Sequence, residues 1–251
     1  GGKNMKKFLK LLTFGLCAFM LVSCNEKESE NTLASEKTYV IATNAEYPPF
    51  EYLENDKIVG LDADIISEIA KKTGIKYEWK NMNFDGLIPA LQTKKIDVAI
   101  AGMSITPERA KAVNFSIPYL TSNVAIIANK SKPINGKEDL INKTYGAELG
   151  TTKEAVARKI EGASVVPFSS NTAALVALKS GKIDGIVVDE SVANSFVQKN
   201  PDLVLVTCLD GEPKAIAFNK DSVALKEKFD KALKELLDDG TIAKLREKYG
   251  V

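Results

Sequence analysis

Apolar runs of strand length alternate with amphipathic stretches along most of this chain, from about residue 38 onward. Thr38–Thr43 and Ile96–Ala101 are short apolar runs, the second broken only by Asp97. Asp62–Lys72 instead repeats apolar residues at helical spacing, and Gly74 follows it as a stop signal. Strands and helices that alternate across short loops predict an α/β fold. We expect a mainly parallel sheet covered by helices, with ligand-binding loops beyond the carboxyl ends of its strands.

The same pattern restarts after a polar break at Asn129–Gly136. Two such α/β units in a chain of 251 residues predict two lobes. We expect the strands and helices of the second unit at Lys143–Ala147, Lys153–Ile160, Ser164–Pro167, Asn171–Lys179, Ile183–Val188, Glu190–Lys199 and Leu203–Val206.

The last part of the chain is expected to return to the first lobe. A strand at Lys214–Phe218 would join the first sheet, and two helices separated near Gly240 follow it within Ser222–Lys248. The chain then crosses between the lobes near Thr121–Val124 and again near Leu209–Glu212, which predicts a hinge and a ligand cleft. The resulting division assigns residues 38–122 and 211–251 to lobe 1 and residues 123–210 to lobe 2.

The N-terminal segment has a different composition. Residues 1–4 precede the first methionine, and we set them aside as an expression remnant or a misplaced start. From Met5 a lysine-rich stretch leads into the apolar run Leu11–Val22. This run is shorter than the roughly 20 residues of a membrane span and is typical of a signal peptide. We therefore expect residues 1–23 to be removed and the protein to be exported.

Leu21–Cys24 resembles the lipobox of bacterial lipoproteins, in which the cysteine is acylated and becomes the mature N-terminus. The alternative is a plain signal peptide with an incidental cysteine. If Cys24 is acylated, its lipid chains anchor the protein to a bacterial membrane on the extracytoplasmic side. Residues 24–37 contain one large apolar side chain and are expected to form a flexible tether.

Charge and composition narrow the possible functions. Four of the 34 basic residues lie in the first 23 positions, which carry no acid, so the rest of the chain has 30 basic and 33 acidic residues. A slightly acidic body does not favour nucleic acid as a partner. The chain has no histidine, which removes the commonest general base and the commonest transition-metal ligand. Cys208 is the single cysteine after residue 24, so we expect no internal disulfide and no metal site. We also expect no cofactor and no catalytic residues.

The residues from Gly102 to Tyr119 carry the most distinctive chemistry. Gly102 and Ser104 follow a predicted strand, and Pro107 suits the first turn of a short helix that also contains Arg109. Unpaired backbone N–H groups at such a junction favour an anion, and an arginine adds a planar clamp for a carboxylate. These residues therefore suggest a carboxylate receptor. Taken alone, however, they favour an ordinary capped helix that carries a surface arginine.

Several motifs together resemble the type II periplasmic solute-binding proteins, and more narrowly the polar amino-acid receptors (family 3) of ABC importers. The resemblance implies a two-lobed periplasmic-binding-protein fold, a free L-amino acid as ligand and an importer permease as partner. We expect a monomer. The motifs occur in order at Tyr47–Glu51, Gly60–Asp64, Phe84–Leu91, Gly102–Tyr119, Gly150–Thr152 and Asp184–Asp189.

The resemblance also implies roles for individual residues. Arg109 and the backbones of Ser104 and Thr152 would hold an α-carboxylate. The Gly102 carbonyl, the Ser104 hydroxyl and Asp189 would hold an α-ammonium. Charge-assisted hydrogen bonds of this kind are what a zwitterion needs when it leaves water. The full set of expected binding residues is Asn44, Tyr47, Phe84, Gly102, Met103, Ser104, Arg109, Glu148, Thr151, Thr152 and Asp189.

Some of these residues have simpler interpretations. Asp189 could cap the helix that begins at Glu190, and Thr152 could be an N-cap and nothing more. Tyr47 and Phe84 could be core aromatics instead of walls around a ligand side chain.

Glu148 suggests the class of ligand. It stands where the family commonly contacts the ligand side chain, and a cationic ligand would neutralise an acid in a closed cleft. We therefore expect a basic amino acid: lysine, arginine, ornithine or histidine. Asn44 weakens this inference, because family members that bind basic ligands often have aspartate there, and Glu148 could also be a solvated loop residue. The alternatives are a receptor for a neutral polar amino acid such as glutamine, a cyclic-acid dehydratase on the same fold, or a sensor domain.

Overall fold

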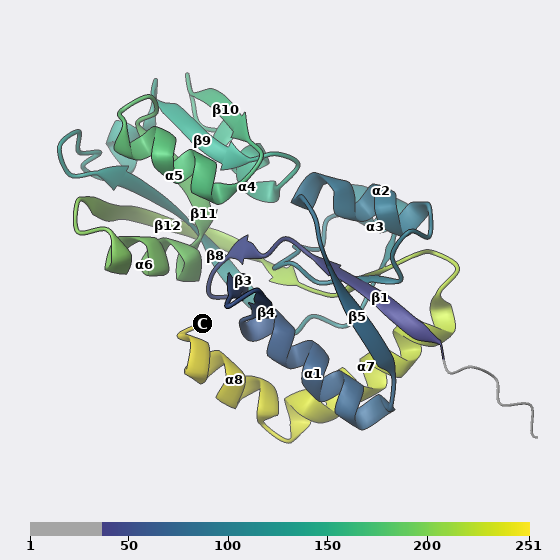
Figure 1. The fold of residues 1–251 in the computed structure, drawn as a ribbon. Helices are drawn as coiled ribbons and strands as arrows, with labels where there is room; N and C mark the ends of the chain where they lie inside the picture. The colour runs from purple at the N-terminus through teal and green to yellow at the C-terminus, as the bar shows by residue number, and fades with distance from the viewer. Residues whose placement is uncertain (1–36) are drawn as a thin grey trace, which may run out of the picture. The chain divides into compact units, whose positions relative to one another are not determined.

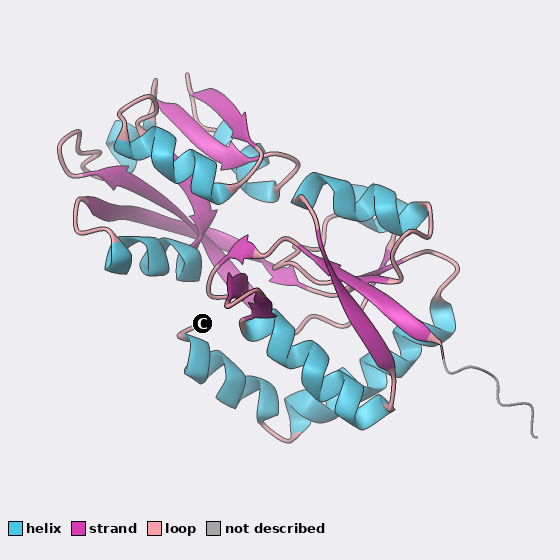
Figure 2. Cartoon of the chain, viewed as in Figure 1, coloured by secondary structure: helices cyan, strands magenta, loops and turns pink. Residues whose placement is uncertain are grey.

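The computed structural model describes residues 37–251. The predicted signal peptide, the lipidation site Cys24 and all of the tether except Lys37 lie outside the described residues. Within 37–251 the chain forms two five-stranded sheets and a small three-stranded sheet, with helices packed against the two larger ones (Figures 1 and 2). Most strands and helices appear where the hydrophobic pattern predicted them, but the strands expected at Ile96–Ala101 and Lys214–Phe218 are shortened to Val98–Ala99 and Ala217–Phe218.

The first sheet has the strand order β5-β1-β6-β13-β7. Strands β5, β1 and β6 are parallel, whereas β13 runs antiparallel to its neighbours β6 and β7. Helix α1 packs against α7 and α8 (Figure 1). The bounds are β1 Thr38–Thr43, β5 Lys76–Asn81, β6 Val98–Ala99, β7 Asn114–Phe115, β13 Ala217–Phe218, α1 Leu61–Thr73, α2 Leu87–Gln92, α3 Pro107–Ala112, α7 Val223–Asp238 and α8 Thr241–Tyr249.

The second sheet has the order β10-β9-β11-β8-β12, with β10, β9 and β11 parallel and the last two strands antiparallel. Helix α6 packs against β8 and β12, and α4 and α5 pack against β9. The bounds are β8 Leu120–Asn129, β9 Thr144–Glu148, β10 Ser164–Phe168, β11 Gly185–Asp189, β12 Leu203–Lys214, α4 Thr152–Arg158, α5 Asn171–Lys179 and α6 Glu190–Lys199.

The two long strands β8 and β12 pair with each other where the sequence predicted the crossings between the lobes. The register shifts between Leu209 and Glu212, and Gly211 lies in this shift. A Cβ atom at Gly211 would come within 1.7 Å of the Ser122 carbonyl oxygen, so only glycine fits there without movement of the backbone. The strand expected at Leu203–Val206 is much longer in the structure, because it extends through the crossing to Lys214.

The core occupies both faces of each sheet. In β1, Ile41 packs into one hydrophobic cluster and its neighbour Ala42 into another. In β8, Ile127 and Ile126 divide between two clusters in the same way. Alternate side chains point to opposite faces, so a strand buried on both sides appears in the sequence as a continuous apolar run.

Local signals set the ends of several elements. Gly74 ends α1 in the left-handed conformation at φ 70°, and Thr106 caps α3 by accepting a hydrogen bond from the Arg109 N–H. The elements that the sequence did not predict have two to four residues, which is too short for a periodic pattern. They are β2 Glu46–Tyr47 and β7, together with the 3₁₀ turns Phe84–Gly86 and Lys137–Leu140.

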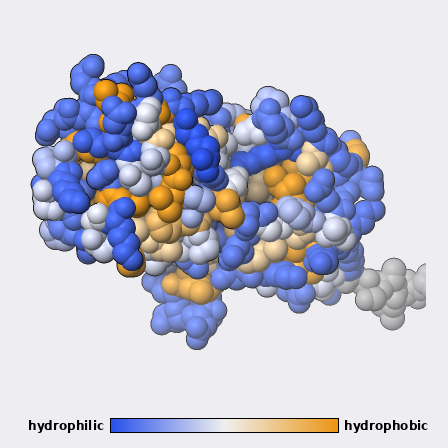
Figure 3. Space-filling view, turned by 90° about the horizontal axis from the view of Figure 1, so that it is seen from above, coloured by the Kyte–Doolittle hydropathy of each residue, from blue (hydrophilic) through white to orange (hydrophobic). Residues whose placement is uncertain are grey.

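The surface is mostly hydrophilic, with hydrophobic residues visible in patches on both halves of the face seen from above (Figure 3). Among residues 37–251, no helix combines the length and the apolar character that a membrane crossing requires.

Candidate functional site

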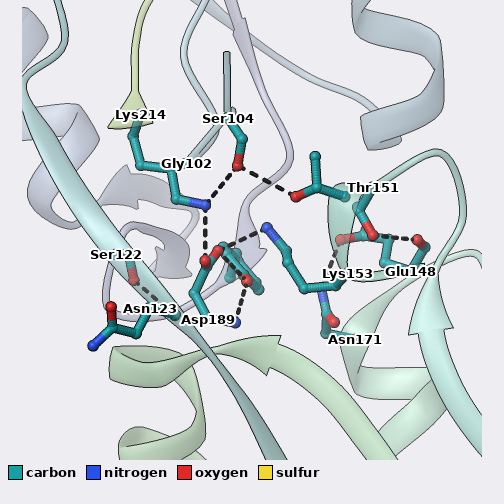
Figure 4. Close-up of polar contacts among 12 residues, drawn as sticks. Gly102, Ser104, Ser122, Asn123, Glu148, Thr151, Lys153, Asn171, Asp189 and Lys214 are labelled. Carbon is teal, nitrogen blue, oxygen red and sulfur yellow. Dashed lines mark hydrogen bonds and ion pairs between the residues drawn. The ribbon is translucent and has the colours of Figure 1, made fainter. Parts of the chain in front are cut away.

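The site lies where strands of both large sheets end at their carboxyl ends (Figure 4). Asn44 follows β1 and Gly102 follows β6 in the first sheet, while Glu148 and Asp189 are the last residues of β9 and β11 in the second. The loops that follow parallel strands emerge at this edge of the sheet, which is why ligand sites occur there. The structure therefore brings together polar residues that lie far apart in the sequence.

Asp189 is the centre of one end of the site. Its Oδ1 atom accepts a hydrogen bond from Lys214 Nζ at 2.7 Å, and its Oδ2 atom accepts one from Lys153 Nζ at 2.7 Å and one from the Tyr47 hydroxyl at 2.7 Å. The side chain is fully buried. Burial alone would raise the pKa of Asp189, but the positive charges of Lys153 and Lys214 outweigh it and the pKa is lowered. This carboxylate therefore stays ionised and already has two cations as partners.

Lys214 is the last residue of β12, and its backbone also bonds to segments near the first sheet. Lys214 pairs with Ser104 in an isolated antiparallel bridge, and its carbonyl accepts a hydrogen bond from the Tyr119 N–H at 3.0 Å. The Lys214 ammonium also donates to Ser104 Oγ at 2.9 Å. Ser104 Oγ lies 3.3 Å from Oγ1 of Thr152, the first residue of α4. Lys214 and Ser104 therefore connect the two sheets beside Asp189.

Arg109 lies close to this cluster. Its Nη1 donates to the Ser104 carbonyl at 2.8 Å and its Nη2 donates to the Gly150 carbonyl at 3.0 Å, so its guanidinium also joins the two halves of the site. The guanidinium lies 5.2 Å from the centre of the Phe84 ring. A guanidinium has five N–H donors, so several remain that could hold a carboxylate.

Glu148 forms the other end of the site, and no cation among residues 37–251 forms an ion pair with it. Its carboxylate accepts from Asn44 Nδ2 at 3.2 Å and from Asn171 Nδ2 at 2.6 Å. The side chain is buried, and burial raises the pKa of Glu148 to about 7, although the charge of Lys153 opposes the shift. Two neutral amides support this carboxylate without neutralising it.

A small cavity lies between the two ends. Its volume is about 10 Å³, which is room for about one water molecule. Tyr47 and Phe84 pack in hydrophobic clusters and also form part of the cavity wall, so their role as walls around a ligand side chain stays a prediction. The Tyr47 hydroxyl also accepts the Asp189 N–H at 3.0 Å. The residues around the cavity are Asn44, Tyr47, Glu51, Phe84, Ala101, Glu148, Thr151 and Lys153.

Two carboxyl groups lie behind this cavity. Asp62 accepts hydrogen bonds from the Gly102 N–H at 2.8 Å and from the Tyr119 hydroxyl at 3.1 Å, and burial raises its pKa to about 6. Glu51 is buried beside it, and burial together with the Asp62 charge raises its pKa well above the usual range. Such a pair holds a proton readily, which limits the negative charge at the back of the site.

The structure settles the simpler interpretations of two residues. Asp189 stands at the N-cap position of α6 but makes no capping hydrogen bond, because its side chain binds the two lysines. The N-cap of α4 is Thr151, whose Oγ1 accepts from the Glu154 N–H, so the interpretation of Thr152 as the cap was wrong. Met103 packs in the hydrophobic cluster with Phe84, and a role for it in binding stays a prediction.

Sequence reasoning missed Lys153, Asn171 and Lys214. Lys153 had a usable signal, because a lysine in the first turn of a helix is unfavourable next to the helix dipole and needs a compensating partner. Lys214 was taken as the start of a strand, and Asn171 as the start of a helix. Nothing in their local patterns indicated that they face the cleft.

Two α/β lobes with a charged cleft between them, joined by two crossing strands, define a solute-binding protein of the periplasmic-binding type. The chain belongs to the bacterial extracellular solute-binding proteins, family 3, whose model matches residues 39–251. Its relatives are solute-binding proteins, which confirms the prediction of a receptor over that of an enzyme. Within residues 37–251, no group of three or more histidine, cysteine, aspartate or glutamate side chains is arranged to hold a metal ion.

Individual relatives point the same way. The chain is 36% identical over 252 residues to the arginine-binding extracellular protein ArtP of Bacillus subtilis, an alignment that covers 98% of both chains. It is 36% identical over 214 residues to ABC transporter arginine-binding protein 1 of Escherichia coli, which covers 82% of this chain and 88% of the relative. A solved ancestral arginine-binding protein bound to arginine superimposes with a TM-score of 0.80 at 44% identity, covering 84% of this chain and 97% of the other.

Proposed function

We propose that this protein is the receptor of an ABC importer for an L-amino acid with a cationic side chain, which it binds by closing its two lobes. The observation that carries the proposal is Glu148, a buried carboxylate with only amide donors around it and a pKa raised to about 7. A ligand cation placed there would supply the charge partner that the protein itself does not. The names of the arginine-binding relatives support the same class of ligand.

The opposite end of the site suits the head group of an amino acid. Arg109, Ser104 and Thr152 would hold the carboxylate with charge-assisted hydrogen bonds, and Asp189 would be the acceptor for the α-ammonium. Asp189 ends β11 and Thr152 begins α4 in the second lobe, whereas Arg109 lies in α3 and Ser104 follows β6 in the first, so the ligand contacts both lobes only when they are closed. The cavity of about 10 Å³ is too small to admit an amino acid without separation of the lobes. Because the ligand binds the closed form more tightly than the open form, binding shifts the conformational equilibrium towards the closed form.

The cellular setting follows from the N-terminal segment. We propose that the protein acts as a monomer outside the cytoplasm, held to the membrane by lipid at Cys24, and that the importer permease recognises its closed form. The lipobox-like residues 21–24 and the preceding apolar run support this anchor.

Calorimetric titration of the purified protein with the twenty L-amino acids and ornithine tests the ligand class. We expect binding heat from arginine, lysine, ornithine or histidine. Tight binding of a neutral amino acid such as glutamine, with no heat from any basic one, would overturn the proposal.

Arg109→Ala tests the carboxylate site separately. We expect this variant to lose at least about 100-fold in affinity, the scale of a lost charge-assisted bidentate contact, while its thermal unfolding remains cooperative. Wild-type affinity in this variant would refute the role of Arg109.

A further inference from the structure

We infer that Lys214 is a specificity-determining residue that competes with the α-ammonium of the ligand for Ser104 and Asp189. The inference deepens the proposed function and rests on it. Its starting point is the contact of the Lys214 ammonium with Ser104 Oγ at 2.9 Å and with Asp189 Oδ1 at 2.7 Å. An α-ammonium is also a primary ammonium with three donors, and it would need the same two acceptors.

The charge balance around Asp189 supports competition. Lys153 and Lys214 together carry two positive charges against the single negative charge of Asp189, and all three side chains are at most 7% exposed. A third ammonium added to this cluster would face a net positive charge in a poorly solvated place. The α-ammonium of a ligand therefore binds at Asp189 only when one lysine leaves, and Oδ2 is already shared by Lys153 and Tyr47.

The backbone of Lys214 explains why this lysine is the one that competes across the cleft. Residues on either side of it are hydrogen-bonded to the strand-like segment that contains Ser104, through the Ile105 N–H to the Pro213 carbonyl at 2.9 Å and the Ala215 N–H to the Met103 carbonyl at 3.0 Å. Lys214 is the last residue of β12, and these bonds tie it to the segment that follows β6 of the first sheet, while Asp189 ends β11 in the second sheet. Lys153 lies in the first turn of α4, in the same half as Asp189, and stays with it when the lobes separate.

The energetics favour displacement of Lys214. Burial, together with the charge of Lys153, lowers its pKa to about 8, although Asp189 acts in the opposite direction. The ion pair therefore does not offset the full cost of removing this ammonium from water. A ligand that takes its place returns Lys214 to solvent.

Paired titrations with two ligands test the inference. L-Arginine has an α-ammonium, and 5-guanidinopentanoic acid is the same molecule without it. In Lys214→Met we expect the affinity for arginine to rise about tenfold, while the affinity for the analogue changes less than about threefold. Lys199→Met, which removes an exposed lysine on α6, is the matched control and should leave both affinities unchanged. A loss of arginine affinity in Lys214→Met, or an unchanged ratio between the two ligands, would overturn the inference.

A measurement without ligand keeps the test independent of the proposed function. Lys214 bridges the two lobes through Asp189, so Lys214→Met should shift the distance between fluorophores on the two lobes towards the open form in the absence of ligand. If neither arginine nor its analogue binds to either protein, the proposed ligand class fails, but the distance measurement still decides the role of Lys214. An unchanged distance distribution would contradict it.

Discussion

The two buried carboxylates of the cleft differ in one respect that explains their opposite pKa shifts. Asp189 has two lysines in contact, and its pKa is lowered; Glu148 has two amides, and its pKa is raised to about 7. Both are buried, so desolvation acts on both in the same direction. The protein itself therefore provides counter-charges at one end of the cleft and neutral amide donors at the other.

Removal of Asp189 should have the largest effect. Asp189→Ala leaves the buried ammoniums of Lys153 and Lys214 without a counter-ion, and we expect a loss of about 3–5 kcal/mol in the free energy of unfolding. Urea denaturation followed by circular dichroism measures it. Asp210→Ala, at an exposed position of β12, is the control. A loss below about 1 kcal/mol would mean that the lysines find other partners and that the ion pairs do not stabilise the fold.

Glu148→Gln should instead reduce the ligand affinity while the protein remains folded. Glutamine keeps the size and an acceptor for one of the two asparagines, and the amide of the other can turn to accept from the new NH2 group, but glutamine cannot neutralise a cation. We expect the affinity for arginine to fall about 30-fold, and that for citrulline, its neutral isostere, to stay nearly constant. Equal losses for both ligands would show that Glu148 contributes shape and not charge.

The raised pKa of Glu148 predicts a pH dependence of binding. A cationic ligand needs the ionised form, so the contribution of Glu148 to the affinity for arginine should be constant above pH 7 and fall about tenfold per pH unit below it. Titrations at pH 8 and pH 6 of the wild-type protein and of Glu148→Gln measure the change. The ratio of the two affinities isolates Glu148, because Lys214, whose pKa is lowered to about 8, titrates in both proteins.

The smallest expected effect concerns the stability of the protein without ligand. The pKa of Glu148 is higher in the folded protein than its usual 4.5, so its contribution to stability is full below pH 4.5 and is lost as the pH rises through about 7. Glu148→Gln should therefore raise the melting temperature by a few degrees at pH 8, about 1 kcal/mol, and not at pH 4.5. An equal rise at both pH values would point to packing instead of charge.

Much of the fold could be predicted from the sequence because its elements are buried on defined faces. The strand Thr38–Thr43 and the helices Asn171–Lys179 and Glu190–Lys199 have the predicted bounds. Their apolar positions repeat with the period of the element, and caps such as Ser170 mark their ends. The length of β12 could not be predicted, because its extension past Val206 is stabilised by pairing with β8 and not by a pattern of its own.

The site was only partly predictable for the same reason. Asn44, Asp189 and Glu148 follow strands, and the rule that ligand loops lie at the carboxyl ends of parallel strands identifies them. Lys153 and Lys214 meet at Asp189 only because α4 and the end of β12 approach it from different lobes. A contact between residues so far apart in sequence leaves no trace in the local pattern.

The fit of Gly211 against the Ser122 carbonyl has a mechanical consequence. At this point the two crossing strands meet backbone against backbone, and the clearance between them is less than one carbon atom. A single methyl group at position 211 would force the two strands apart where they cross between the lobes. A substitution at position 211 could therefore change the angle between the lobes, for example in a protein engineered as a sensor, without changing any side chain of the cleft.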